Sequence, residues 1–183
     1  INVKERIAIL EGVRTPMIKM GGQLAALSAD ELGAIPVREC LARTGLDGQS
    51  IGEVLIGNCA QPAHAANVAR VIALKAGVPK SVPAMTVHRN CASGMEAITT
   101  GANRLLLGEA DCVISGGVES MSNIPLFYNQ EMTAFFAALS KAKTLGQKMR
   151  VLSRFRLRFL APKVGLLMGL TDPICNQIMG MTA

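Results

Sequence analysis

Short apolar runs alternate with longer amphipathic segments along most of the chain, and this alternation most constrains the fold. The apolar runs occupy residues 6–13, 53–57, 82–87 and 111–116. The segments between them have the apolar spacing of helices and cover residues 30–44, 67–76 and 92–107. Strands that alternate with helices of about ten or more residues form a mainly parallel sheet with helices on both faces. The sequence therefore predicts a three-layer α/β unit with the element order βαβαβαβ.

Local signals mark where the first predicted helix begins and ends. Ser28 and Glu31 have the spacing of a capping box, and Gly45 follows the helix. Pro36 predicts a kink or a later start, because proline lacks the N–H group that a helix interior needs.

Cys91 comes directly after the third predicted strand and directly before a helix. Ligands and catalytic groups collect at the carboxyl ends of parallel strands, and the N-terminus of a helix favours a thiolate over a thiol. Ala92, Ser93 and Gly94 are small enough to let a bulky acyl group approach the sulfur. From the residues alone, a nucleophile and a buried structural cysteine are equally compatible with this position.

The other cysteines give no sign of a disulfide framework or a metal site. The chain has five cysteines, which is an odd number, and no CxxC pair. Cys40, Cys59 and Cys112 have apolar sequence neighbours, and we expect them to be buried, reduced thiols. No role is assigned to Cys175.

Residues that often assist a nucleophilic cysteine are scarce. His64 and His88 are the two histidines. His88 lies on an extended segment, where a packing role at the strand end is favoured over a base for Cys91, and nothing assigns chemistry to His64. The run from Gly116 to Asn123 has neither phosphate-loop nor dinucleotide-binding spacing, and Glu119 alone indicates nothing. We find no Cys–His–acid triad.

The last part of the chain carries the excess positive charge. Residues 141–183 hold eight Lys and Arg and one acidic residue, giving +7, whereas residues 1–140 hold eleven and twelve, giving −1. The spacing predicts one helix with an apolar face made of Leu145, Met149, Leu152, Phe155 and Phe159. A separate basic stripe consists of Arg150, Arg154 and Arg158, and Pro162 ends the pattern.

Three interpretations of residues 141–163 stay open. The segment can be a solvated basic helix packed by its apolar face, a surface for an anionic ligand such as the phosphates of a nucleotide-like cofactor, or a contact with an anionic membrane. RNA binding is disfavoured because few aromatic side chains are available to stack on bases.

We expect a soluble, intracellular and cytoplasmic protein. No apolar run approaches the roughly 18–20 residues that cross a bilayer. The charged start, residues 1–6, lacks the apolar stretch of a signal peptide.

Several motifs in order give the chain a resemblance to the amino-terminal part of the thiolases, enzymes that exchange an acyl group between a cysteine and coenzyme A. The matching residues are Arg14-Thr15-Pro16, Gln61 with Asn67-Val68-Ala69-Arg70, Asn90-Cys91-Ala92-Ser93-Gly94, Gly116-Gly117-Val118-Glu119-Ser120-Met121-Ser122 and Met179-Gly180-Met181-Thr182-Ala183. They span essentially the whole chain. Residues 140–162 look most like the β-subunit of fatty-acid oxidation complexes.

The resemblance implies a 3-ketoacyl-CoA thiolase. On this basis Cys91 attacks the ketone of a 3-ketoacyl-CoA, acetyl-CoA leaves, and the shortened acyl chain passes to free coenzyme A. The Cys91 N–H helps to stabilise the oxyanion. Coenzyme A is a substrate, and no permanently bound cofactor or metal is expected.

The resemblance also implies two domains and several partners. Residues 1–125 correspond to the amino-terminal α/β domain without its last strand, and residues 126–183 to part of a helical loop domain. That loop domain lies over the coenzyme A site and, in this subgroup, near a membrane or a hydratase/dehydrogenase α-subunit. The candidate residues for coenzyme A phosphates or a membrane are Lys148, Arg150, Arg154 and Arg158. A homo-oligomer is expected, without nucleic acid, in the mitochondrial matrix if the source is eukaryotic.

The chain departs from the thiolase pattern in two ways. Ala63 and Ala65 replace glycines found in many thiolases. The family's Gly-His-Pro histidine, second cysteine and Asn-Glu motif all come later than Ala183, so we expect little complete turnover from these residues alone. The alternatives are an incomplete fragment that acts as a coenzyme A-binding or assembly module, and a condensing synthase of the same fold that also uses Cys91.

Overall fold

The structure is a computed structural model that describes residues 6–182. The chain divides into two compact units, with the division between Ile124 and Pro125, and each unit is described by itself. The charged first residues, 1–5, and Ala183 of the last motif lie outside the described residues.

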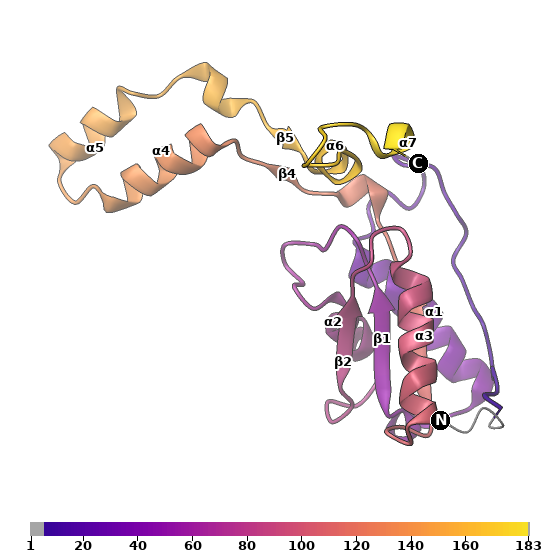
Figure 1. Cartoon of the computed structure of the whole chain (residues 1–183). Helices are drawn as coiled ribbons and strands as arrows, with labels where there is room; N and C mark the ends of the chain where they lie inside the picture. Colours follow the sequence, from indigo (N-terminus) through magenta and orange to yellow (C-terminus); the bar gives the residue numbers. More distant parts are fainter. Residues whose placement is uncertain (1–5, 183) are drawn as a thin grey trace. The chain divides into compact units, whose positions relative to one another are not determined.

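The first unit is a parallel sheet with helices on both faces (Figure 1). Within the described residues, its strands are β1 (Glu53–Gly57), β2 (Ala84–Val87) and β3 (Val113–Gly117), in the order β2-β1-β3. Its α-helices are α1 (Ala29–Thr44), α2 (Val68–Lys75) and α3 (Ser93–Leu106). Short 3-10 turns, η1 (Gly48–Ser50) and η2 (Met121–Asn123), lie in the connections. The predicted α/β class is confirmed.

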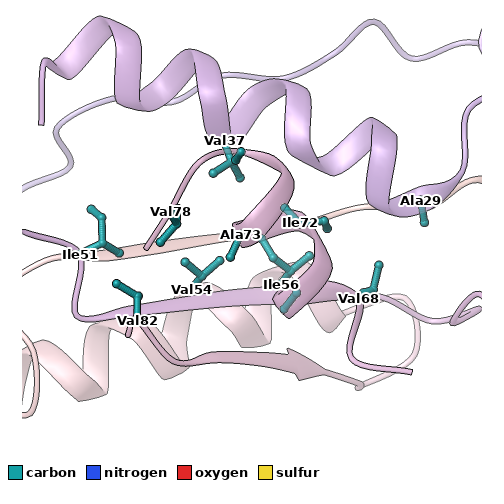
Figure 2. Packing of buried hydrophobic residues seen from close by; sticks show 12 residues of the cluster. Ala29, Val37, Ile51, Val54, Ile56, Val68, Ile72, Ala73, Val78 and Val82 are labelled. Atoms are coloured by element: carbon teal, nitrogen blue, oxygen red, sulfur yellow. The ribbon is translucent and has the colours of Figure 1, made fainter. Parts of the chain in front are cut away.

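Successive side chains of β1 point to opposite faces of the sheet, and helices cover both faces. Val54 and Ile56 point to one face, where α2 and then α1 cover them in a cluster of buried aliphatic residues (Figure 2). Leu55 points to the opposite face, where α3 packs so closely that a Cβ on Gly101 would lie 3.4 Å from Leu55 Cδ1. Leu55 is fully buried. β1 is thus covered on both faces, as its continuous apolar run predicts.

Helix α1 begins where the capping box predicts and runs through Pro36 without a break. Ser28 and Glu31 hydrogen-bond each other reciprocally, and Gly45 closes the helix in the left-handed region with φ of 66°. The predicted later start is therefore wrong, because the cap and the apolar packing of α1 outweigh the one backbone hydrogen bond that proline removes.

Asn67 and Arg70 connect α2 to β2. Asn67 caps α2 by accepting from the Arg70 N–H at 3.2 Å, and its amide donates to Ala84 O at 2.9 Å. The Arg70 guanidinium donates to Val82 O at 2.6 Å and Lys80 O at 2.8 Å. The Asn-x-Ala-Arg motif of the sequence therefore fixes the helix against the strand next to Cys91.

Residues 6–13 do not form the predicted strand. A strand exists only when a neighbour pairs with its backbone, and the ladders found in the described residues join only β1 with β2, β1 with β3 and β4 with β5. Ile9 is 91% exposed and Leu10 is 63% exposed, so the apolar run is not packed either.

The second unit is a pair of short strands and a helical hairpin. The strands β4 (Leu126–Phe127) and β5 (Lys163–Val164) pair antiparallel, and α4 (Gln130–Lys141) and α5 (Leu145–Leu152) form the hairpin (Figure 1). A 3-10 turn, η3 (Leu157–Leu160), precedes β5, and α6 (Gly165–Leu170) and α7 (Met179–Thr182) follow it. Among the described residues, no helix is long and apolar enough to span a membrane.

The predicted single helix over residues 145–159 is wrong, because α5 ends at Leu152. Past that point the chain turns, so that Phe155 and Phe159 reach Phe135 of α4 with ring centroids 5.4 and 6.1 Å away. Three aromatic rings in mutual contact favour this turn over further helix. The basic stripe is broken with it: Arg150 lies on α5, Arg154 in the turn and Arg158 on η3.

A buried carboxylate joins α1 to α2 in the first unit. Asp30 is almost fully buried, and it contacts Lys75 Nζ at 2.6 Å and His64 Nε2 at 2.9 Å. Burial opposes ionisation, but the hydrogen bonds from Lys75, Ser28 and His64 outweigh it and hold the pKa of Asp30 well below its usual range. Asp30 therefore stays charged while the protein is folded.

We predict that the free energy of unfolding depends less on pH in the acid range in Asp30→Asn than in the wild-type protein. A lowered carboxyl pKa stabilises the folded state above the unfolded value of about 3.9, and this stabilisation is lost as the pH falls through the folded pKa. The wild-type free energy of unfolding should therefore fall steeply below about pH 4, and that of Asp30→Asn less steeply. Denaturant unfolding between acid and neutral pH measures this. The exposed Asp111→Asn is the control, and an equal slope in Asp30→Asn would contradict the assignment.

Candidate active site

The candidate site lies at the carboxyl edge of the sheet, where three connections meet. Because β1, β2 and β3 are parallel, Gly57, Val87 and Gly117 are register partners at this edge. Cys59, Cys91 and Glu119 follow these strand ends within a few residues. The fold brings these three side chains to one edge, as expected for Cys91.

Two glycines let α3 begin against the backbone of the sheet. A Cβ on Gly57 would lie 2.2 Å from the Ser93 carbonyl carbon, a distance that real Cβ atoms do not adopt. A Cβ on Gly117 would lie 3.0 Å from Gly94 Cα. The first turn of α3 therefore fits only because β1 and β3 both end in glycine.

Cys91 lies on the tight turn that enters α3. Ala92 N–H donates to Arg89 O and Ser93 N–H to Asn90 O, each at 3.1 Å. Asn90 adopts a positive φ of 49°, a conformation that asparagine tolerates better than most residues. The turn carries the Cys91 side chain to the exposed surface directly before the helix.

Ser93 holds this turn from inside. Its side chain is buried, and its hydroxyl donates to Asn90 O at 2.6 Å while it accepts from Arg89 N–H at 2.8 Å. The buried hydroxyl is therefore fully used within the turn. Ser93, which sequence reasoning treated only as a small residue, is the positioning group of the Cys91 turn.

Glu119 joins the connections that follow β3 and β1. Its carboxylate accepts from Cys59 N–H at 2.9 Å, from Ala60 N–H at 3.3 Å and from the Asn58 amide at 3.0 Å. Asn58 is buried and also donates to Val118 O at 2.9 Å. Sequence reasoning assigned no role to Glu119, and its place past a strand end at the same edge as Cys91 was the available signal.

Cys59 contacts the Cys91 turn directly. Its thiol donates to Asn90 O at 2.7 Å, and its sulfur lies 3.6 Å from Ser93 Oγ. Burial raises the pKa of Cys59, although the contact with Ser93 opposes this. Burial likewise raises the pKa of Cys40 and of Cys112. The three thiols are free as predicted, but they are half-buried rather than fully buried.

Neither histidine supplies a base for Cys91. His88 is exposed, so the predicted packing role is wrong; its ring accepts a long contact of 3.5 Å from Asn90 N–H. β2 ends at Val87, which leaves His88 outside the sheet. His64 contacts Asp30, as described above. Within residues 6–182, we find no side chain that hydrogen-bonds the Cys91 sulfur.

The four basic candidates all lie in the second unit. Lys148 and Arg150 belong to α5, Arg154 to the following turn and Arg158 to η3. All four are exposed, and Arg158 forms an ion pair with Glu131 at 2.7 Å. The first three have no ion-pair partner in the described part of the chain, which leaves their charges available to an anion.

Two further motifs meet beside Glu119. Residues 14–20, Gly117 and residues 119–122 are among those that line a cavity of about 330 Å³. Ser122 Oγ accepts from Gly21 N–H at 3.0 Å. Asn123 donates to Leu27 O at 2.9 Å. The Arg-Thr-Pro segment and the Gly-Gly-Val-Glu-Ser-Met-Ser segment are thus neighbours in space.

We predict that Gly57→Ala destabilises the first unit by at least about 1–3 kcal/mol, the usual cost of forcing extra atoms into a packed interior. The added methyl group meets the Ser93 backbone, which cannot rotate away. Denaturant unfolding followed by circular dichroism measures the change. Gly116→Ala on β3 is the matched control, because a Cβ there has no described atom within 4 Å. Equal stability of the two variants would show that the contact does not constrain α3.

Comparison with known proteins identifies the family to which this chain belongs. Residues 7–183 match the family model described as thiolase, N-terminal domain. The mitochondrial trifunctional enzyme subunit beta of Mus musculus is 35% identical over 179 residues, which are 98% of this chain and 37% of that protein. A 3-ketoacyl-CoA thiolase of Vibrio cholerae is 36% identical over 158 residues, which are 86% of this chain and 36% of that protein.

Solved structures of similar proteins support the same family. The Bacillus anthracis acetyl-CoA acetyltransferase superposes with a TM-score of 0.76 and 32% identity, over 93% of this chain and 38% of that one. The Acat5 thiolase from Ascaris suum in complex with coenzyme A superposes with a TM-score of 0.74 and 29% identity, over 92% and 39%. This chain thus spans between a third and two fifths of the length of these relatives. The chain belongs to the thiolase family and corresponds to its amino-terminal domain.

Proposed function

We propose that this chain provides the nucleophile of a 3-ketoacyl-CoA thiolase acting in fatty-acid β-oxidation. Cys91 accepts the acyl group, acetyl-CoA is released, and the shortened acyl chain passes to coenzyme A. The observation that carries the proposal is the position of Cys91, exposed on a hydrogen-bonded turn at the N-terminus of α3. The names of the relatives, a 3-ketoacyl-CoA thiolase and a trifunctional enzyme subunit beta, support this reaction.

The turn suits a nucleophile that attacks a carbonyl group. The thiolate is the reactive form of a cysteine, and Cys91 comes directly before the first turn of α3. Attack forms the sulfur–carbon bond and places negative charge on the carbonyl oxygen. Within the described residues the Ala92 and Ser93 N–H groups are used inside the turn, whereas we find no acceptor for the Cys91 N–H. That N–H is therefore free to donate to the oxyanion.

The complete reaction needs a second acid/base group. Cleavage of the 3-ketoacyl chain leaves negative charge on the α-carbon of acetyl-CoA, which must take up a proton. Neither His64 nor His88 is placed for this, and no carboxylate of the described residues hydrogen-bonds the Cys91 sulfur. We therefore propose that this group lies outside these 183 residues, and that the segment alone accepts an acyl group without complete turnover.

The proposal extends to partners and place of action. Coenzyme A is the expected substrate, and the similar thiolase from Ascaris suum was solved in complex with coenzyme A. The name of one relative, a trifunctional enzyme subunit beta, supports assembly with an α-subunit. We further propose that this α-subunit carries the hydratase and dehydrogenase steps and that the chain forms a homo-oligomer. A location in the mitochondrial matrix follows if the source is eukaryotic, and the cytoplasm otherwise.

Two alternatives are distinguishable by assay. A condensing synthase of the same fold also uses a cysteine at this place, and it decarboxylates a malonyl thioester rather than cleaving a 3-ketoacyl-CoA. A non-catalytic coenzyme A-binding or assembly module binds coenzyme A without any acylation of Cys91. The names of the similar proteins, a 3-ketoacyl-CoA thiolase and an acetyl-CoA acetyltransferase, favour the thiolase over both.

We predict that incubation with acetyl-CoA adds one acetyl group to the chain, seen by intact mass spectrometry. Cys91→Ala should abolish the adduct, because it removes the sulfur that accepts the acyl group. Cys175→Ala is the matched control, because Cys175 is also exposed but lies in the second unit away from any helix start of comparable length. No adduct on the wild-type chain, or an adduct that survives Cys91→Ala, would overturn the proposed role.

We predict a second, electrostatic contact between the second unit and coenzyme A or an anionic lipid surface. Replacing Arg150 and Arg154 by Ala should weaken binding, and the wild-type affinity should fall with salt, since the screening length shrinks from about 10 Å at 0.1 M to about 3 Å at 1 M. Titration calorimetry with coenzyme A and sedimentation with anionic vesicles separate the two ligands.

Arg158→Ala should weaken this binding less than the Arg150 and Arg154 changes, because Glu131 already neutralises Arg158. Arg43→Ala is the control for loss of a surface charge, since Arg43 pairs with Glu39 in the first unit. Binding that is equal at low and high salt would contradict an electrostatic contact.

A further inference from the structure

Two cysteines from neighbouring connections meet at the carboxyl edge of the sheet. Cys59 follows β1 and Cys91 follows β2, and the two strands are hydrogen-bonded neighbours that pair Gly57 with Val87. The Cys59 thiol donates to Asn90 O at 2.7 Å. The carbonyl group of Asn90 forms the peptide bond to Cys91, so the Cys59 sulfur lies against the peptide group that carries Cys91.

The two thiols have different surroundings. Cys91 is exposed on the turn before α3, where an oxidant can reach it. Cys59 is half-buried beneath that turn, with Ser93 Oγ 3.6 Å from its sulfur, and burial raises the pKa of its thiol despite the contact with Ser93. An exposed thiolate reacts first with an oxidant, and a protected neighbouring thiol resolves the product.

We propose that Cys59 and Cys91 form an oxidation site at which a hydroperoxide converts the two thiols into a reversible disulfide. Cys91 is the attacking thiol and Cys59 is the resolving thiol. The inference needs only a reactive Cys91 thiolate and not acyl transfer, so it goes beyond the proposed function and can fail independently of it.

The reaction balances with hydrogen peroxide as the oxidant. The Cys91 thiolate attacks one peroxide oxygen, the O–O bond breaks, and hydroxide leaves, which gives a sulfenic acid on Cys91. The Cys59 sulfur then attacks the Cys91 sulfur, the S–O bond breaks, and the hydroxyl group leaves as water with the Cys59 proton. Each sulfur gives up one electron, and the peroxide is reduced to two molecules of water in total.

The surrounding contacts keep Cys59 next to the Cys91 turn. Glu119 holds the Cys59 and Ala60 N–H groups, so the backbone of Cys59 stays beside the turn. To form the disulfide, the Cys59 side chain exchanges its hydrogen bond to Asn90 O for a bond to the Cys91 sulfur. The disulfide blocks the sulfur that would accept an acyl group, and a thiol reductant restores it.

The experiment treats the full chain with limiting hydrogen peroxide, alkylates the remaining thiols and maps tryptic peptides without reduction. Cys91 is the only cysteine of the peptide 90–104, and Cys59 is the only cysteine of the peptide 44–70. We expect these two peptides to be joined by a disulfide and to separate on reduction. The disulfide should form before Cys40 or Cys112 is oxidised. Joining of Cys91 to any other cysteine, or between two copies of the chain, would overturn the proposal.

Trapping of the intermediate gives an independent measurement. Dimedone labels a sulfenic acid, so Cys59→Ser should raise the label on Cys91 several-fold by removing the resolving thiol. Cys112→Ser, which removes another half-buried thiol, should leave both the label and the disulfide unchanged. Equal labelling in the wild-type chain and Cys59→Ser would contradict a resolving role. The peptide map of the wild-type chain decides the proposal even if Cys59→Ser does not fold.

Discussion

The close approach of α3 to the ends of β1 and β3 is the constraint on which the site depends. Side chains at Gly57 or Gly117 would collide with the backbone of Ser93 or Gly94, so α3 can start at the sheet edge only because both strands end in glycine. The start of α3 fixes the preceding turn, and the turn fixes Cys91. A contact between backbones thus determines where the backbone of Cys91 lies.

Hydrogen bonds then connect the segments that follow the three strands, and these bonds hold the Cys91 turn. Ser93 closes the Cys91 turn from within, Cys59 reaches the same turn from the connection after β1, and Glu119 holds that connection from the end of β3. None of these groups is a base for Cys91. The described residues therefore hold the Cys91 turn through several hydrogen bonds, and our proposal assigns the acyl acceptor to this turn and the proton transfers to other groups.

Local patterns predicted the parts of the molecule that local interactions decide. The alternation of apolar runs and capped helices anticipated β1–β3 and α1–α3, and the strand-to-helix position singled out Cys91. Residues 6–13 failed as a strand because pairing needs a neighbour, and the predicted helix over 145–159 ended early because Phe155 and Phe159 pack on Phe135. The roles of Ser93, Cys59 and Glu119 come from contacts between separate connections, which spacing along one sequence does not reveal.

The most direct measurement is the rate at which iodoacetamide alkylates each cysteine of the chain at neutral pH, followed by peptide mapping with and without acetyl-CoA. Cys91 and Cys175 are both exposed, so simple access does not separate them. If the turn before α3 makes Cys91 the acyl acceptor, Cys91 reacts faster than Cys175, and acetyl-CoA protects Cys91 alone. Equal rates at the two cysteines, or a Cys91 rate that acetyl-CoA leaves unchanged, would contradict that role.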